Sequence, residues 1–130
     1  TGDVSMQFDG ASLFAALTYT RLTDLVETLP RANLLAFVLQ GSSYITNQTE
    51  VFARYETGSS DVPQFADEEL HLITIGCNHY IDGHDLKLTA DLGFSFGKVA
   101  GIFANTQTGW QADGAKDNQV VLRTELQFMF

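Results

Sequence analysis

The sequence lacks much of what most functional classes require. Its one cysteine, Cys77, excludes an intrachain disulfide and lies in a strand-like stretch, where a thiol usually serves as a packing group. No apolar run approaches the roughly 20 residues of a transmembrane helix, because the longest is Leu34 to Leu39. Seven basic residues against sixteen acidic ones give a net charge of -9. This argues against a nucleic-acid partner, since no Lys/Arg cluster exists to displace counterions from phosphates.

Catalytic and metal-binding motifs are also missing. The histidines, His71, His79 and His84, accompany no Ser or Cys nucleophile motif, and no Gly-rich phosphate loop occurs. His71 and His79 can share a strand face, but the intervening strand separates them by roughly 26 Å, too far for one metal ion. We therefore expect no enzyme activity, no cofactor and no metal site.

What the chain does contain is alternation with a period of two, the pattern of β-strands. The clearest example places Leu86, Leu88, Ala90, Leu92, Phe94 and Phe96 on one face and Asp85, Lys87, Thr89, Asp91, Gly93 and Ser95 on the other. Its 130 residues suit a single domain, 1–130, or part of one. The pattern predicts seven strands, at Asp3–Phe8, Leu13–Tyr19, Asn33–Ile45, Thr49–Glu56, Glu69–Ile81, Asp85–Phe96 and Leu122–Phe130.

The predicted connections alternate between short and long. Short links fall at Asp9–Gly10, Thr46–Gln48 and Asp82–Gly83, and longer ones at Asp24–Ala32, Thr57–Glu68 and Gly97–Asp117. The first long link is expected because Pro30 interrupts a hydrogen-bonded ladder. An up-and-down sheet would place all short links on one rim and all long links on the other. That asymmetry is typical of outer-membrane barrels, which have short periplasmic turns and longer extracellular loops.

Aromatic residues follow the same geometry. We expect two interfacial girdles, with Tyr19, Tyr55, Phe94 and Phe96 near the long-link rim and Tyr44, Tyr80, Phe128 and Phe130 near the other. The alternative is that aromatic side chains simply favour strands.

Three segments carry a resemblance to a known family. Val51–Glu56, Ile73–Ile81 and Val121–Phe130 resemble the C-terminal half of the phosphate-selective porin O and P family. The resemblance extends over Val51–Phe130, and it implies a homotrimeric barrel in the Gram-negative outer membrane. The last strand also resembles the signal read by the barrel assembly machinery, which implies Leu126, Phe128 and Phe130 as the contact residues. Cys77 and His79 depart from the family pattern, in which larger apolar or aromatic residues are more frequent.

These observations predict an all-β fold, an antiparallel up-and-down transmembrane β-barrel. Seven strands would leave unpaired edges in lipid, which a bilayer does not tolerate. Because the resemblance is to a C-terminal half, it implies that the chain is a C-terminal part of a larger barrel, and a complete eight-stranded barrel is the alternative.

The expected function is that of an outer-membrane porin for passive diffusion of small polar or anionic solutes. A water-filled barrel has a polar interior, so the predicted pore-lining residues are Glu50, Arg54, Glu56, Asp85, Lys87, Asp91, Arg123 and Glu125. Arg54 and Arg123 are the predicted solute contacts, because guanidinium groups recognise carboxylates and phosphates. Two alternatives remain: a soluble β-barrel that binds an apolar ligand inside, and a non-conducting outer-membrane barrel that acts as an adhesin or anchor.

Overall fold

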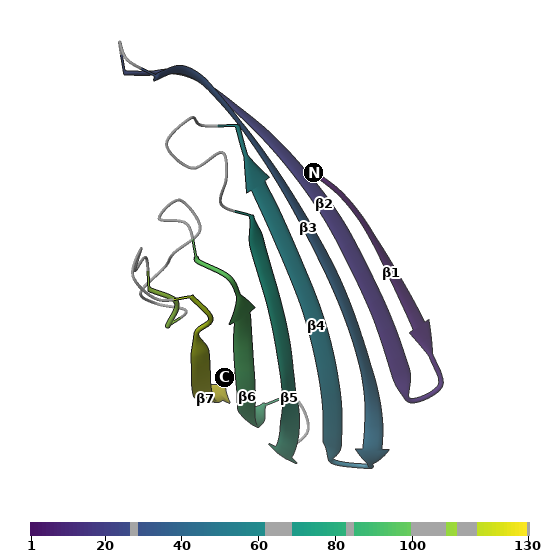
Figure 1. The fold of residues 1–130 in the computed structure, drawn as a ribbon. Helices are drawn as coiled ribbons and strands as arrows, with labels where there is room; N and C mark the ends of the chain where they lie inside the picture. The colour runs from purple at the N-terminus through teal and green to yellow at the C-terminus, as the bar shows by residue number, and fades with distance from the viewer. Residues whose placement is uncertain (27–28, 62–68, 83–84, 100–108, 112–116, 130) are drawn as a thin grey trace.

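One antiparallel sheet accounts for nearly all of the described chain (Figure 1). The computed structural model describes residues 1–26, 29–61, 69–82, 85–99, 109–111 and 117–129. Its strands are β1 (Gly2–Phe8), β2 (Ala11–Val26), β3 (Leu29–Thr46), β4 (Thr49–Ser60), β5 (Leu70–Asp82), β6 (Leu86–Phe96) and β7 (Val120–Phe128).

The strands follow one another across the sheet in chain order, from β1 to β7. Every neighbouring pair is antiparallel, so the all-β, up-and-down prediction is confirmed. The sheet is open, because β1 and β7 do not pair with each other within the described residues. The described part of the chain contains no helix that is long and apolar enough to span a membrane.

The predicted long link Asp24–Ala32 is wrong. β2 continues to Val26 and β3 begins at Leu29, so both strands extend beyond the others (Figure 1). Pro30 falls where the β2–β3 register shifts, and pairing between β3 and β4 ends at Leu34 and Ser60. Pro30 therefore lies in a two-stranded extension, where no third strand needs the N–H that proline lacks.

The two sides of the sheet carry different kinds of side chain. One side, here called the apolar face, has two complete rows of paired residues that cross all seven strands. The first row is Met6, Leu13, Gly41, Ala53, Ile75, Leu92 and Leu122; the second is Val4, Ala15, Leu39, Tyr55, Ile73, Phe94 and Val120. The flanking rows, from Gly2 to Phe96 and from Phe8 to Thr124, also contain no Asp, Glu, Lys or Arg.

The other side, here called the polar face, contains the strand residues that are buried from solvent. All the buried strand residues of the described chain lie on it: Gly58, Ser60, Leu72, Thr74, Gly93 and Ser95. On the apolar face, by contrast, large side chains are open, and Leu122 is 73% exposed. Within the described residues, no strand packs on that face, since each strand contacts only its neighbours in the sheet.

Candidate functional site: the polar face

The polar face gathers most of the residues predicted to line a pore. Strand pairing places seven of them on this side: Glu50, Arg54, Glu56, Lys87, Asp91, Arg123 and Glu125. Asp85 differs, because β6 begins only at Leu86 and Asp85 lies exposed in the preceding link. There its backbone N–H donates to the carbonyl of Asp82 (2.9 Å), and its carbonyl accepts from the N–H of Met129 (2.9 Å).

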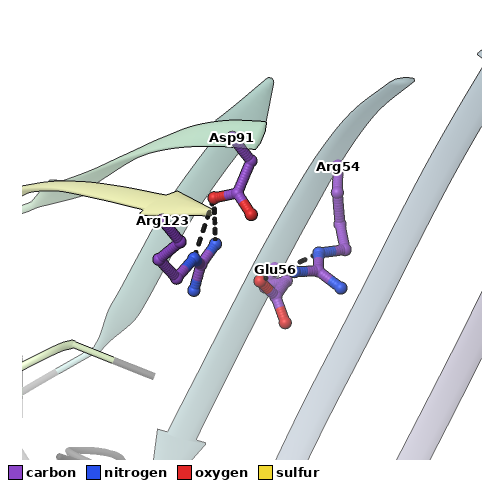
Figure 2. Close-up of polar contacts among 4 residues, drawn as sticks. All are labelled: Arg54, Glu56, Asp91 and Arg123. Carbon is purple, nitrogen blue, oxygen red and sulfur yellow. Dashed lines mark hydrogen bonds and ion pairs between the residues drawn. The ribbon is translucent and has the colours of Figure 1, made fainter. Parts of the chain in front are cut away.

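Asp91 and Arg123 form the closest ion pair on this face (Figure 2). They are opposite one another on β6 and β7. Arg123 Nε donates to Asp91 Oδ1 over 2.8 Å, and Nη2 lies 2.7 Å from the same oxygen. The side chains are only 24% and 13% exposed. Partial burial and short charge-assisted hydrogen bonds make this pair stronger than a typical surface ion pair.

Arg54 and Glu56 form a looser pair on β4 (Figure 2). They are two residues apart and therefore share a face, with Arg54 Nε 3.3 Å from Glu56 Oε2. Their side chains are about one-third exposed, at 32% and 28%, which weakens the attraction by solvent screening. In the register, Arg54 of β4 is opposite Thr74 of β5. Asp91 of β6 is opposite Gly76 of β5. No long side chain of β5 therefore stands between the two ion pairs.

A polar network occupies the short-link end of the same face. Glu50 Oε2 accepts hydrogen bonds from Asn78 Nδ2 (2.9 Å) and from the Tyr80 hydroxyl (2.7 Å). Thr89 Oγ1 extends the network by donating to Asn78 Oδ1 over 2.8 Å. The ring of Tyr44 stacks on that of Tyr80, with ring centroids 5.7 Å apart. This end of the face therefore offers a carboxylate beside two aromatic rings.

The network corrects part of the predicted aromatic girdles. Tyr44 and Tyr80 lie on the polar face and not on the apolar face, because their positions pair with Glu50 and Lys87. The phenol of Tyr80 donates a hydrogen bond to Glu50 on the polar face, which satisfies its hydroxyl group there. The others that the structure describes do lie on the apolar face: Tyr19, Tyr55, Phe94, Phe96 and Phe128. Phe130 is outside the described residues.

The predicted assembly residues Leu126 and Phe128 share the apolar face of β7. They pair with Leu88 and Leu86 of β6, and they are 52% and 57% exposed. Cys77 also lies on the apolar face, between Val51 and Ala90, as a free and partly buried thiol. Its neighbours in the register, Val51 and Ala90, are apolar, so the thiol lies in a packing environment.

A hydrophobic cluster at the long-link end was not predicted. It consists of Leu72 on β5 with Val99 and Trp110 from the connection between β6 and β7, each no more than 5% exposed. Trp110 falls within the predicted long link Gly97–Asp117, for which no packing contact was predicted. The sequence signal for this contact was Gly93, the one polar-face position of β6 with no side chain. The indole of Trp110 lies against this glycine.

Two further findings concern the described residues as a whole and the relatives of the chain. Among the residues the structure describes, no group of three His, Cys, Asp or Glu side chains is arranged to hold a metal ion. Comparisons with protein-family models, curated proteins and solved structures find no match. The resemblance to phosphate-selective porins therefore stays a prediction that depends on the three sequence segments alone.

Proposed function

We propose that this sheet is part of the wall of an outer-membrane porin, through which small polar or anionic solutes diffuse passively. The observation that supports it best is the apolar face, whose four successive rows carry no Asp, Glu, Lys or Arg. In a transmembrane barrel this face contacts lipid, and the opposite, charged face contacts water. In water, by contrast, an apolar surface crossing seven strands would favour association.

The length of the strands suits this role. β6 is 11 residues long, and at about 3.3 Å per residue such a strand extends about 35 Å. Tilted by roughly 40°, it spans about 25 Å, the height of the apolar band of outer-membrane barrels. The shortest strand, β1 with 7 residues, is at one edge of the sheet.

Closure of the wall is the second element of the proposal. The outer edges of β1 and β7 present backbone N–H and C=O groups that hydrocarbon cannot satisfy. Additional strands close the sheet into a larger barrel, and three such barrels associate as a trimer. The barrel assembly machinery recognises β7 by Leu126 and Phe128, which face outward, and inserts the barrel into the membrane.

The charges on the polar face set the expected selectivity. The Asp91–Arg123 and Arg54–Glu56 pairs alternate acids with bases across the wall, which creates a transverse field that orients polar solutes. Arg123 is held by Asp91 at short range, so Arg54, in the looser pair, is the better candidate for a solute contact. The net charge of -9 argues against strong anion preference. The proposal assigns no catalytic residue and no cofactor.

Site-directed spin labelling of the complete polypeptide tests the orientation of the faces. In a Cys77→Ala background, single cysteines replace Leu122, Thr124 and Leu126 on the apolar face, and Glu125 and Gln127 on the polar face. In lipid vesicles the first set should collide mainly with oxygen, and the second with a water-soluble nickel chelate. The reverse pattern, or a protein that is folded and monodisperse in buffer without detergent, indicates a soluble barrel with an apolar interior and would overturn the proposal.

Conductance tests the porin step separately. The reconstituted protein should produce discrete current steps in planar bilayers, and vesicles that contain it should swell in small sugars. A protein that inserts with the predicted label pattern but carries no current is an adhesin or anchor, and the porin proposal fails.

A further inference from the structure

A hollow of about 230 Å³ lies at the short-link end of the polar face, beside the turn between β1 and β2. Its lining includes Gln7 of β1, Ser12 of β2, Ser42 and Tyr44 of β3, and Glu50 of β4. The register of the strands places these residues on the polar face. The volume is below the roughly 300 Å³ at which pockets for drug-sized ligands begin, so the hollow suits a smaller molecule.

Backbone hydrogen bonds hold the aromatic side of the hollow in place. The N–H of Tyr44 donates to the carbonyl of Gly10 in the β1–β2 turn over 2.8 Å. The N–H of Tyr80 donates to the carbonyl of Gln48 in the β3–β4 turn, also over 2.8 Å. The ring of Tyr80 stacks on one face of the Tyr44 ring, with 28° between the planes, and Tyr44 is still 41% exposed. The other face of the Tyr44 ring is therefore the one left to meet a ligand.

The polar side of the hollow consists of a carboxylate and a row of hydrogen-bonding groups. Glu50 is oriented by the two hydrogen bonds to its Oε2 that are described above. A carboxylate has about four acceptor positions, so acceptor capacity remains for a hydroxyl of a ligand. The hydroxyls of Ser12 and Ser42 lie 2.7 Å apart, and Gln7 pairs with Ser12 in the register. Hydroxyl and amide groups both donate and accept, which suits a ligand that does the same.

A monosaccharide in its ring form fits this combination. One face of a sugar ring carries C–H groups that can pack on an aromatic ring, whose face is electron-rich. Its hydroxyls both donate and accept hydrogen bonds. An organic cation fits less well, because Lys87, opposite Tyr80, places a positive charge at the same end of the face. An anion such as phosphate would be repelled by the carboxylate of Glu50.

We propose that the hollow binds a neutral monosaccharide, which stacks on Tyr44 and donates a hydrogen bond to Glu50. Gln7 and the Ser12–Ser42 pair bind further hydroxyls of the sugar. The inference goes beyond the proposed function, because it requires that the polar face meets water but does not require conduction. Binding is weak, in the millimolar range, since a single exposed ring and a few hydrogen bonds hold a small ligand.

Saturation-transfer NMR of the complete polypeptide tests the site directly. The protein is folded in tetraoxyethylene octyl ether, a detergent without a sugar or ammonium head group, and the probe is methyl β-D-glucopyranoside. The ring protons of the probe should receive saturation, and a titration should give a millimolar Kd. Sorbitol, which has the hydroxyls but no ring, should bind at least about tenfold more weakly. Equal binding of the two compounds, or no binding of the glucoside, contradicts the inference.

Variants at Tyr44 separate ring stacking from the other contacts. Tyr44→Ala should raise the Kd of the glucoside at least about tenfold, through loss of the apolar contact. Tyr44→Phe keeps the ring, and its Kd should stay within about twofold of the wild-type value. Tyr19→Ala is the matched control, because it removes a tyrosine of the apolar face and should leave the Kd unchanged. An unchanged Kd in Tyr44→Ala, or equal losses in Tyr44→Ala and Tyr44→Phe, would show that the ring does not stack on the sugar.

Glu50→Gln tests the polar side and keeps the inference testable if Tyr44→Ala does not fold. The change is nearly isosteric and makes charge-assisted hydrogen bonds neutral, so the Kd should rise about fivefold. An unchanged Kd rules out Glu50 as a sugar contact. Tetramethylammonium and inorganic phosphate serve as competing probes, and neither should displace the glucoside. Displacement by the first indicates a cation site and displacement by the second an anion site, and either result overturns the inference.

Binding and conduction fail independently. A protein that binds the glucoside but carries no current in planar bilayers supports the site and contradicts the proposed function. A conducting protein that does not bind the glucoside contradicts only the site.

Discussion

The two faces of the sheet are made by the same strands, yet they are organised by different interactions. On the apolar face, large side chains are open and uncharged, as at Met6 (50% exposed) and Leu122 (73% exposed). On the polar face, Arg123 is tied to Asp91, and Glu50 to Tyr80 and Asn78. The charged side chains of the polar face are paired within the sheet, whereas large side chains of the apolar face remain exposed. What surrounds the apolar face, lipid or water, therefore decides which function the sheet can have.

The largest expected effect comes from placing a charge on the apolar face. Met6→Arg should lower the free energy of unfolding in bilayer vesicles by about 2 to 4 kcal/mol, the cost of arginine near the bilayer midplane. Its neighbour on β1, Ser5, points to the polar face, so Ser5→Arg should cost less than about 1 kcal/mol. Urea unfolding of both variants measures the difference. Equal losses would mean that the two faces meet the same solvent.

A smaller effect should separate the two ion pairs of the polar face. Asp91→Asn weakens charge-assisted hydrogen bonds to Arg123 and should cost on the order of 1.5 to 3 kcal/mol. Glu56→Gln weakens a more exposed and longer contact and should cost no more than about 1 kcal/mol. The same unfolding measurement compares them. If Glu56→Gln proves the more damaging, the ranking from distance and burial is wrong.

The smallest effect concerns the long-link rim, where Asp61 follows β4. Its carboxylate accepts hydrogen bonds from the backbone N–H of Asn33 (2.5 Å) and from the Asn33 side chain, and these hold its pKa below the ordinary 3.8. A lowered pKa stabilises the fold above the unfolded value, and this contribution is lost as pH falls through the folded value. Asp61 is fully exposed, so the change is small.

An NMR titration of the Asp61 carboxyl carbon measures that shift directly. Its midpoint should lie below 3.8 in the wild type and move toward that value in Asn33→Ala. A midpoint at or above 3.8 in the wild type would show that the contacts with Asn33 do not form.

Alternation in the sequence was enough to predict the strands and most of their facing. Leu86–Phe96 was predicted residue by residue, because each polar–apolar step flips the side chain to the other face. Glu50, Arg54, Asp91 and Arg123 were placed together for the same reason. A period of two does not say where a chain reverses, so Pro30 was assigned to a loop although it lies in β3.

The alternation of polar and apolar residues did not predict contacts between segments that are far apart in the sequence. Tyr44 and Tyr80 were expected to lie in lipid-facing girdles, but a hydroxyl that reaches Glu50 on the next strand favours the polar side. Trp110 lies 17 positions beyond Gly93, and nothing local links the two. That contact depends on the folded sheet having an empty position of the right size, which a single sequence does not display.

The bare positions of the polar face have one more consequence, for curvature. Gly76 lies beneath the ring of Phe52, just as Gly93 lies beneath Trp110, so neighbouring strands each lack a side chain on the same side. A sheet bends most easily toward the side with fewer atoms, and glycine is a means by which sheets curl. In a closed wall, curvature fixes the circumference and hence the number of strands. In the proposed barrel, these two glycines would therefore contribute to the width of the closed wall.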